Sequence, residues 1–101
     1  MAFDIYLGKE STFIDHHEEL LFEVVNDNPV YPNLNWLWEH FYSGPLISPE
    51  RANDLVHELI SIREKIKDSE NEKYLLLPID RVMPILSKAF KSNQQLKCIS
   101  D

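Results

Sequence analysis

The clearest structural signal in the chain is the stretch SPERANDLVHELISIREKIK at residues 48–67. Ser48 is suited to cap the N-terminus of a helix, and Pro49 fits the first helical position, where its missing N–H costs nothing. The apolar residues that follow recur on one face at helical spacing, and they are Ala52, Leu55, Val56, Leu59, Ile62 and Ile66. This pattern predicts an amphipathic helix that reaches about Lys67.

Three more helices are predicted around this one. Residues 12–27 carry apolar positions at helical spacing behind a candidate N-cap, Thr12. A shorter helix is expected at residues 34–42, where a Ser-Gly-Pro sequence ends it. The last helix is expected to be capped by Asp80, which puts Pro84 within or near its first turn, where proline is tolerated.

The predicted β content is small. Residues 3–7, FDIYL, alternate in the period-2 pattern of a short strand. Residues 94–99 are a candidate for a brief strand beside it, and residues 74–77 are either a strand or a helical turn. The expected fold is therefore mainly α: one domain over residues 1–101, a compact bundle of about four helices with a short N-terminal β-strand and at most a minor sheet.

Composition limits the class of protein. The 101 residues, 44% of them hydrophobic, suffice for one small core. No apolar run approaches the roughly 20 residues that span a bilayer, and the N-terminus lacks the pattern of a signal peptide. The single cysteine, Cys98, fits a reducing compartment. We therefore expect a cytoplasmic protein that has no membrane partner.

The charge of the chain is distributed unevenly. Residues 1–50 contain nine acidic residues and one base, Lys9, whereas residues 51–101 contain eight acidic residues and nine bases. The formal net charge is −7, which is unfavourable for direct nucleic-acid binding because phosphate contacts need clustered Lys and Arg. The acidic first half is either a solvated face that keeps the chain soluble or a surface that attracts a basic partner.

Two aromatic residues fall outside the predicted core faces. The core face of the helix at residues 12–27 is expected to consist of Phe13, Ile14, Leu20, Leu21, Val24 and Val25. Phe22 then lies among carboxylates on the other side, so it either packs under another segment or is an exposed anchor for a partner. Trp36 in the next helix has the same two interpretations. The predicted partner-binding residues are Asp15, Glu18, Glu19, Phe22, Glu23, Trp36, Glu39 and His40.

Motifs for catalysis are missing from the sequence. With only Gly8 and Gly44, a glycine-rich phosphate loop is impossible, and Cys98 is interpreted as a small packed hydrophobe. The one metal-like cluster is residues 15–19, DHHEE, whose adjacent histidines point about 100° apart on a helix. We expect no catalytic residue, no metal and no cofactor. The alternative is a small metal-dependent enzyme that uses His16, His17 and Glu19.

Two segments resemble a known family. The opening FDIYLG at residues 3–8 and the stretch YPNLNWLWEHFYSGPLISPERANDLVHELISIR at residues 31–63 are similar to small immunity proteins of bacterial contact-dependent growth inhibition systems. The resemblance implies a cytosolic protein that binds and blocks one cognate toxin domain, frequently a nuclease with a basic substrate groove. We expect such an inhibitor, acting as a monomer. A regulatory adaptor protein without a toxin is the remaining alternative.

Overall fold

The computed structural model describes residues 2–100, which form four strands, four α-helices and two short 3₁₀ turns. The strands are β1 (Ala2–Leu7), β2 (Glu10–Asp15), β3 (Leu46–Ile47) and β4 (Leu96–Ser100). The α-helices are α1 (Leu20–Val24), α2 (Pro32–Glu39), α3 (Pro49–Ile66) and α4 (Leu76–Ser92). The 3₁₀ turns are η1 (His16–Glu18) and η2 (Lys73–Leu75).

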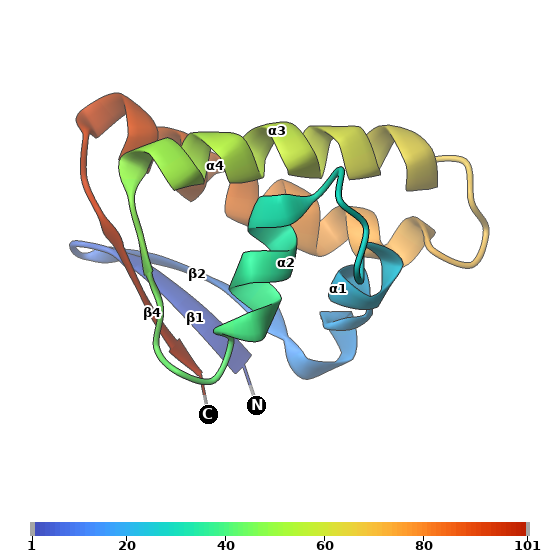
Figure 1. Ribbon diagram of the computed structural model, residues 1–101, viewed down its shortest axis with the longest axis horizontal. Coiled ribbons are helices and arrows are strands. Elements are labelled where there is room, and N and C mark those ends of the chain that lie inside the picture. The colour runs from blue at the N-terminus through green and yellow to red at the C-terminus, as the bar shows by residue number, and fades with distance from the viewer. Residues whose placement is uncertain (1, 101) are drawn as a thin grey trace.

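The strands form one antiparallel sheet in the order β2-β1-β4-β3. Strands β1 and β2 form a hairpin in which Gly8 has a φ of +59°, a conformation that favours glycine at the first loop position. Strand β4 returns beside β1, with Ile5 opposite Cys98 (Figure 1). The prediction of a mainly α bundle with at most a minor sheet is therefore wrong, because the chain is a compact α/β domain with a four-stranded antiparallel sheet.

The core lies between one face of this sheet and the helices. Side chains of β1 alternate between buried and more exposed positions, and the buried residues of the sheet are Phe3, Ile5, Leu7, Thr12, Ile14, Ile47, Leu96 and Cys98. Helices α3 and α4 pack against each other, α4 lies against β2, and α2 packs against α3 (Figure 1). The alternation is the expected pattern for a sheet that has one face on the core.

Helix α3 confirms the prediction made from its own residues. Ser48 Oγ accepts a hydrogen bond from the backbone N–H of Arg51 at 3.2 Å, and Pro49 is the first helical residue. Helix α2 begins two residues earlier than expected, because Glu58 of α3 accepts hydrogen bonds from the backbone N–H groups at its N-terminus. The tail strand next to β1 is confirmed as β4, and residues 74–77 are helical rather than a strand.

Two helix predictions are wrong. The helix expected at residues 12–27 is instead β2, η1 and the short α1, because pairing with β1 fixes residues 10–15 as a strand. Helix α4 begins at Leu76, before Asp80, so Pro84 lies inside the helix and not in its first turn.

Candidate functional site

The structure buries Phe22, the residue predicted to be an exposed anchor. Its side chain is 1% exposed, stacks on Trp38 with ring centroids 5.1 Å apart, and meets Phe41 edge to face at 5.4 Å. The anchor interpretation is therefore wrong, and the alternative, packing under another segment, is correct. The error arises because α1 begins only at Leu20, so the helical phase taken from residues 12–19 does not apply to it.

The exposed apolar residues of α1 are Leu20 and Val24, which the sequence pattern had assigned to the core. Their side chains are 47% and 38% exposed. They line a groove of about 330 Å³ between α1 and the segment around η2. We call this groove, formed by Leu20, Glu23, Val24, Asn71, Glu72, Tyr74 and Leu75, the acidic groove.

Two carboxylates stand at the acidic groove. Glu23 is exposed, and Glu72 is half-buried and accepts a hydrogen bond from Ser69 Oγ at 3.3 Å. Within residues 2–100, neither carboxylate has an ion-pair partner. An apolar floor beside carboxylates suits a Lys or Arg side chain, whose stem can pack on Leu20 and Val24 while its charged end meets an acid.

Glu18 is also an acid of the predicted surface, but it is buried in an ion pair. Arg81 of α4 holds both carboxylate oxygens, with Nη1–Oε1 at 2.7 Å and Nη2–Oε2 at 3.0 Å, and the Asp15 N–H donates to Oε1 at 2.9 Å. Burial pushes the pKa of Glu18 upward, but these hydrogen bonds and the charge of Arg81 outweigh it and lower the pKa below its usual 4.5. Glu18 therefore ties η1 to α4 and does not face solvent.

Glu19 lies beside an aromatic residue that the sequence pattern did not single out. Its carboxylate pairs with His16 Nδ1 at 3.0 Å and accepts a hydrogen bond from the Tyr42 hydroxyl at 3.4 Å. Tyr42 is 67% exposed and meets the ring of Phe41 edge to face, next to Trp38. One sequence signal could have indicated that Tyr42 is exposed. It lies immediately before the Ser-Gly-Pro sequence that ends the helical segment, beyond the buried residues of α2.

Trp36 and Glu39 lie on α2, and His40 follows as its C-terminal cap residue. The two tryptophans of the helix, Trp36 and Trp38, point about 160° apart. The Trp36 ring is half-buried beneath the Arg51 guanidinium, 3.9 Å from the ring centroid. Nδ1 of His40 lies 2.9 Å from the Trp36 carbonyl oxygen, which accepts a hydrogen bond, and Glu39 is exposed. The structure therefore separates Trp36, which contacts α3, from Trp38, which contacts α1 through Phe22.

No protein-family model, curated protein or solved structure matches the chain significantly. None of the helices described within residues 2–100 has both the length and the apolar composition that a membrane crossing requires.

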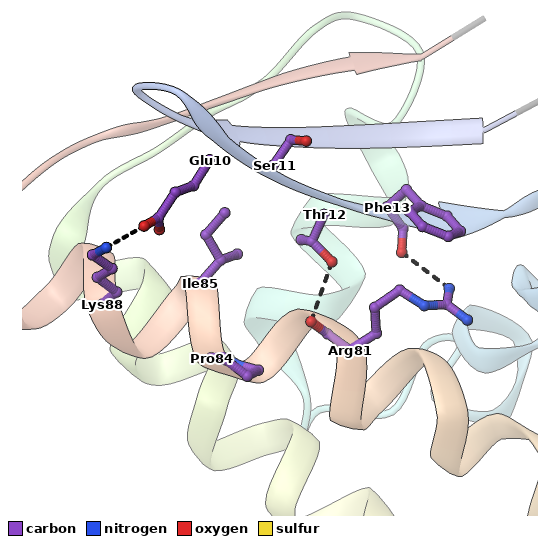
Figure 2. Close-up of a pocket in the computed structure, with 8 residues that line it drawn as sticks. All are labelled: Glu10, Ser11, Thr12, Phe13, Arg81, Pro84, Ile85 and Lys88. Atoms are coloured by element: carbon purple, nitrogen blue, oxygen red, sulfur yellow. Dashed lines mark hydrogen bonds and ion pairs between the residues drawn. The ribbon is translucent and has the colours of Figure 1, made fainter.

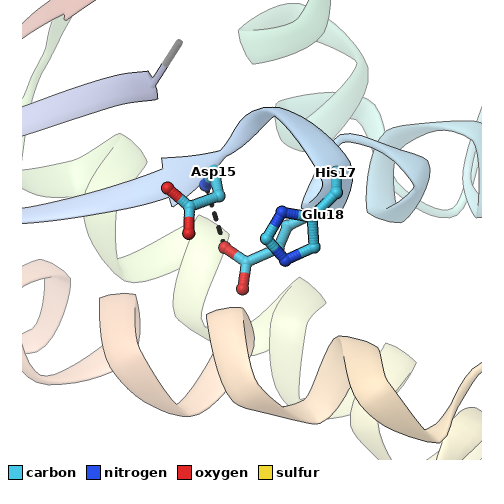
Figure 3. Close-up of side chains that lie close together, drawn as sticks. All are labelled: Asp15, His17 and Glu18. Atoms are coloured by element: carbon cyan, nitrogen blue, oxygen red, sulfur yellow. Dashed lines mark hydrogen bonds between the residues drawn. The ribbon is translucent and has the colours of Figure 1, made fainter.

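The residues that the fold brings together as possible metal ligands differ from those expected from the sequence. Among residues 2–100, the group with ligand atoms within 4.8 Å of one another is Asp15, His17 and Glu18 (Figure 3). His16 is not in it, because it pairs with Glu19. Since both oxygens of Glu18 already bind Arg81, a metal ion would have to displace a guanidinium group from a buried carboxylate. The group is therefore poorly suited to hold a cation.

Cys98 is a core residue of β4. It is buried, and burial raises the pKa of its thiol to about 12. The thiol therefore stays protonated near neutral pH and lacks the thiolate that nucleophilic chemistry needs. Its burial confirms the prediction of a small packed hydrophobe.

Proposed function

We propose that the chain is a non-enzymatic immunity protein that acts in the cytosol and neutralises a basic nuclease toxin domain by binding it at the acidic groove. The observation that carries the proposal is the exposure of Leu20 and Val24 beside Glu23 and Glu72. The resemblance of residues 3–8 and 31–63 to immunity proteins supports the class of function.

The charge around the acidic groove favours a basic partner. No Lys or Arg occurs between Lys9 and Arg51 in the sequence, whereas this stretch holds eight acidic residues. Arg81 neutralises Glu18, and Lys88 pairs with Glu10, so the attraction comes from the remaining acids of the stretch. A nuclease binds phosphates through basic residues, and an acidic protein that pairs with the same residues excludes the nucleic acid.

The test uses the toxin domain encoded directly upstream of this chain, which the proposal requires to exist. Replacing both exposed residues, Leu20→Ala with Val24→Ala, should weaken binding by about 2 kcal/mol, since a few desolvated side chains supply most of an interface's energy. The denaturation midpoint should change little, because both side chains lie at the surface and are already 47% and 38% exposed.

The matched control is Ile60→Ala. Ile60 lies on the exposed side of α3 and is 46% exposed, nearly the same fraction as Leu20. This variant should bind the toxin domain like the unchanged chain and protect cells that express the toxin. Loss of binding in both variants, or in neither, would contradict the assignment of the acidic groove.

A further inference from the structure

The outer edge of β2 is incompletely paired. Strand β2 is at the end of the sheet, with β1 as its one neighbouring strand within residues 2–100. The Phe13 carbonyl accepts from Arg81 Nη1 at 3.3 Å and the Asp15 N–H donates to Glu18, so both residues turn their backbone groups away from β1. Because alternate residues of a strand share a direction, Ser11 also faces outward, while Thr12 faces β1.

Three backbone groups remain for another chain. They are the N–H and C=O of Ser11 and the N–H of Phe13, which no hydrogen bond joins to other groups of residues 2–100. A strand placed opposite Ser11 could exchange both hydrogen bonds with it, as residue pairs in an antiparallel ladder do. The short free stretch ends where Arg81 reaches Phe13, so the added segment would be anchored near Ser11.

A groove runs along this free edge. It has a volume of about 520 Å³ and lies between β2 and α4 (Figure 2). Its lining consists of residues 10–13 on one side and Arg81, Pro84, Ile85 and Lys88 on the other. A second hollow of about 470 Å³ shares Pro84 and Lys88 with it and extends to Lys91.

The α4 wall carries the two cations of the groove, Arg81 and Lys88, and Arg81 is already held by Glu18. Lys88 pairs with Glu10 at one end, and the ion-pair atoms belong to side chains that are 56% and 53% exposed. Lys91 is exposed and has no ion-pair partner within residues 2–100. Exposed pairs of this kind are weak, so Lys88 can exchange Glu10 for another carboxylate at little cost.

We propose that the edge of β2 binds an extended acidic segment of a partner protein, which adds to the sheet as a further strand while its carboxylates meet Lys88 and Lys91. Main-chain hydrogen bonds to Ser11 and Phe13 give affinity, and the basic wall of α4 selects acidic sequences. A second copy of the chain is a poorer occupant, because a symmetric pairing of two β2 edges would bring two basic walls together. This surface is separate from the acidic groove, and the proposed function does not depend on it.

The experiment is a titration of the ¹⁵N-labelled chain with an acetylated and amidated hexapeptide of alternating Glu and Val, followed by amide shifts and hydrogen exchange. The peptide should shift and protect the amides of Ser11 and Phe13. A hexapeptide of alternating Lys and Val should not. Shifts elsewhere, or equal binding of the lysine peptide, would overturn the proposal.

Two substitutions at one position isolate the backbone donor. Ser11→Pro removes the outward N–H without removing a bond to β1, and proline is tolerated on the open side of an edge strand. It should abolish peptide binding, whereas Ser11→Ala, which keeps the N–H, should bind like the unchanged chain. Peptide binding that persists in Ser11→Pro would overturn the proposal.

The preference for acidic sequences is tested with substitutions on α4 that leave β2 unchanged. The double variant Lys88→Glu with Lys91→Glu should weaken binding of the glutamate peptide about tenfold, an effect of two exposed ion pairs. Unchanged affinity would overturn the selection for acidic sequences. Protection of the Ser11 amide in the chain alone, growing with its concentration, would assign the edge to a second copy and would also overturn the proposal.

Discussion

The acidic groove and the β2–α4 groove are built from the same two parts of the chain, yet they differ in charge. The first uses residues 20–24 and 71–75, and the second uses residues 10–13 and 81–88. Glu18 lies between the two sets in the first segment, and its ion-pair partner, Arg81, is the first residue of the β2–α4 groove in the second segment. In the acidic groove, exposed Glu23 and half-buried Glu72 flank apolar side chains. In the β2–α4 groove, exposed Lys88 lies beside an open strand edge. The comparison shows that one buried ion pair can join two segments that carry carboxylates at one groove and a lysine at the other.

The largest effect is expected from breaking the support beneath the acidic groove. Phe22→Ala should lower the free energy of unfolding by about 3 to 5 kcal/mol, because it leaves a cavity beside Trp38 and Phe41. Urea denaturation measures this change. Leu20→Ala, two residues earlier and exposed, is the control and should unfold near the wild-type midpoint. Similar midpoints for the two variants would contradict the orientation of α1.

Helix α3 and the region around Phe22 and Leu20 show which parts of the fold the sequence could predict. Helix α3 was predicted almost to the residue because its cap, its proline and its apolar stripe are all local signals that agree. In residues 10–24, the hairpin with β1 and the packing of Phe22 on Trp38 decide the structure, and both are contacts with other parts of the chain. A helix drawn over this whole region therefore predicted Leu20 to be buried and Phe22 to be exposed, whereas the structure shows the reverse.

The candidate site was predicted in part for the same reason. The acidic character of the first half was evident from composition, and Glu23 is indeed exposed. Glu72 comes from a polar connection without apolar periodicity, and Tyr74 begins the run 74–77, whose pattern did not distinguish a strand from a helical turn, so no local pattern placed them beside α1. Glu18 was predicted as surface because its partner, Arg81, is 63 residues away in the sequence.

The second-largest effect on stability is expected from breaking the buried ion pair between Glu18 and Arg81. Arg81→Ala leaves the Glu18 carboxylate buried without its partner and should destabilise the chain by about 2 to 3 kcal/mol, somewhat less than in a fully buried pair. The control is Arg63→Ala, which breaks an exposed pair with Asp80 and should leave the denaturation midpoint nearly unchanged. Equal midpoints for the two variants would contradict a structural role of the buried pair.

The stability difference between wild type and Arg81→Ala should also depend on pH. The pKa of Glu18 is lowered in the folded chain, so the stability that its pairing contributes is present above the usual value of 4.5 and is lost as the pH falls through the folded pKa. The difference in stability between wild type and Arg81→Ala should therefore narrow as the pH falls below 4.5. A constant difference between pH 7 and about pH 3 would show that Arg81 acts by packing and not by charge.

The smallest expected effect is on the rate of association. The measurement compares how fast the toxin domain binds the Glu23→Lys and Asp54→Lys variants at different ionic strengths. It tests most directly the central claim that the acidic groove recognises a basic partner. Both substitutions change the net charge by two units, but only Glu23 lines the acidic groove, whereas Asp54 is exposed on α3. We predict that Glu23→Lys slows association about tenfold at low salt, that Asp54→Lys slows it far less, and that the difference shrinks as salt screens it. An association rate that is flat across salt, or equal slowing by both variants, would contradict recognition of a basic partner at the acidic groove.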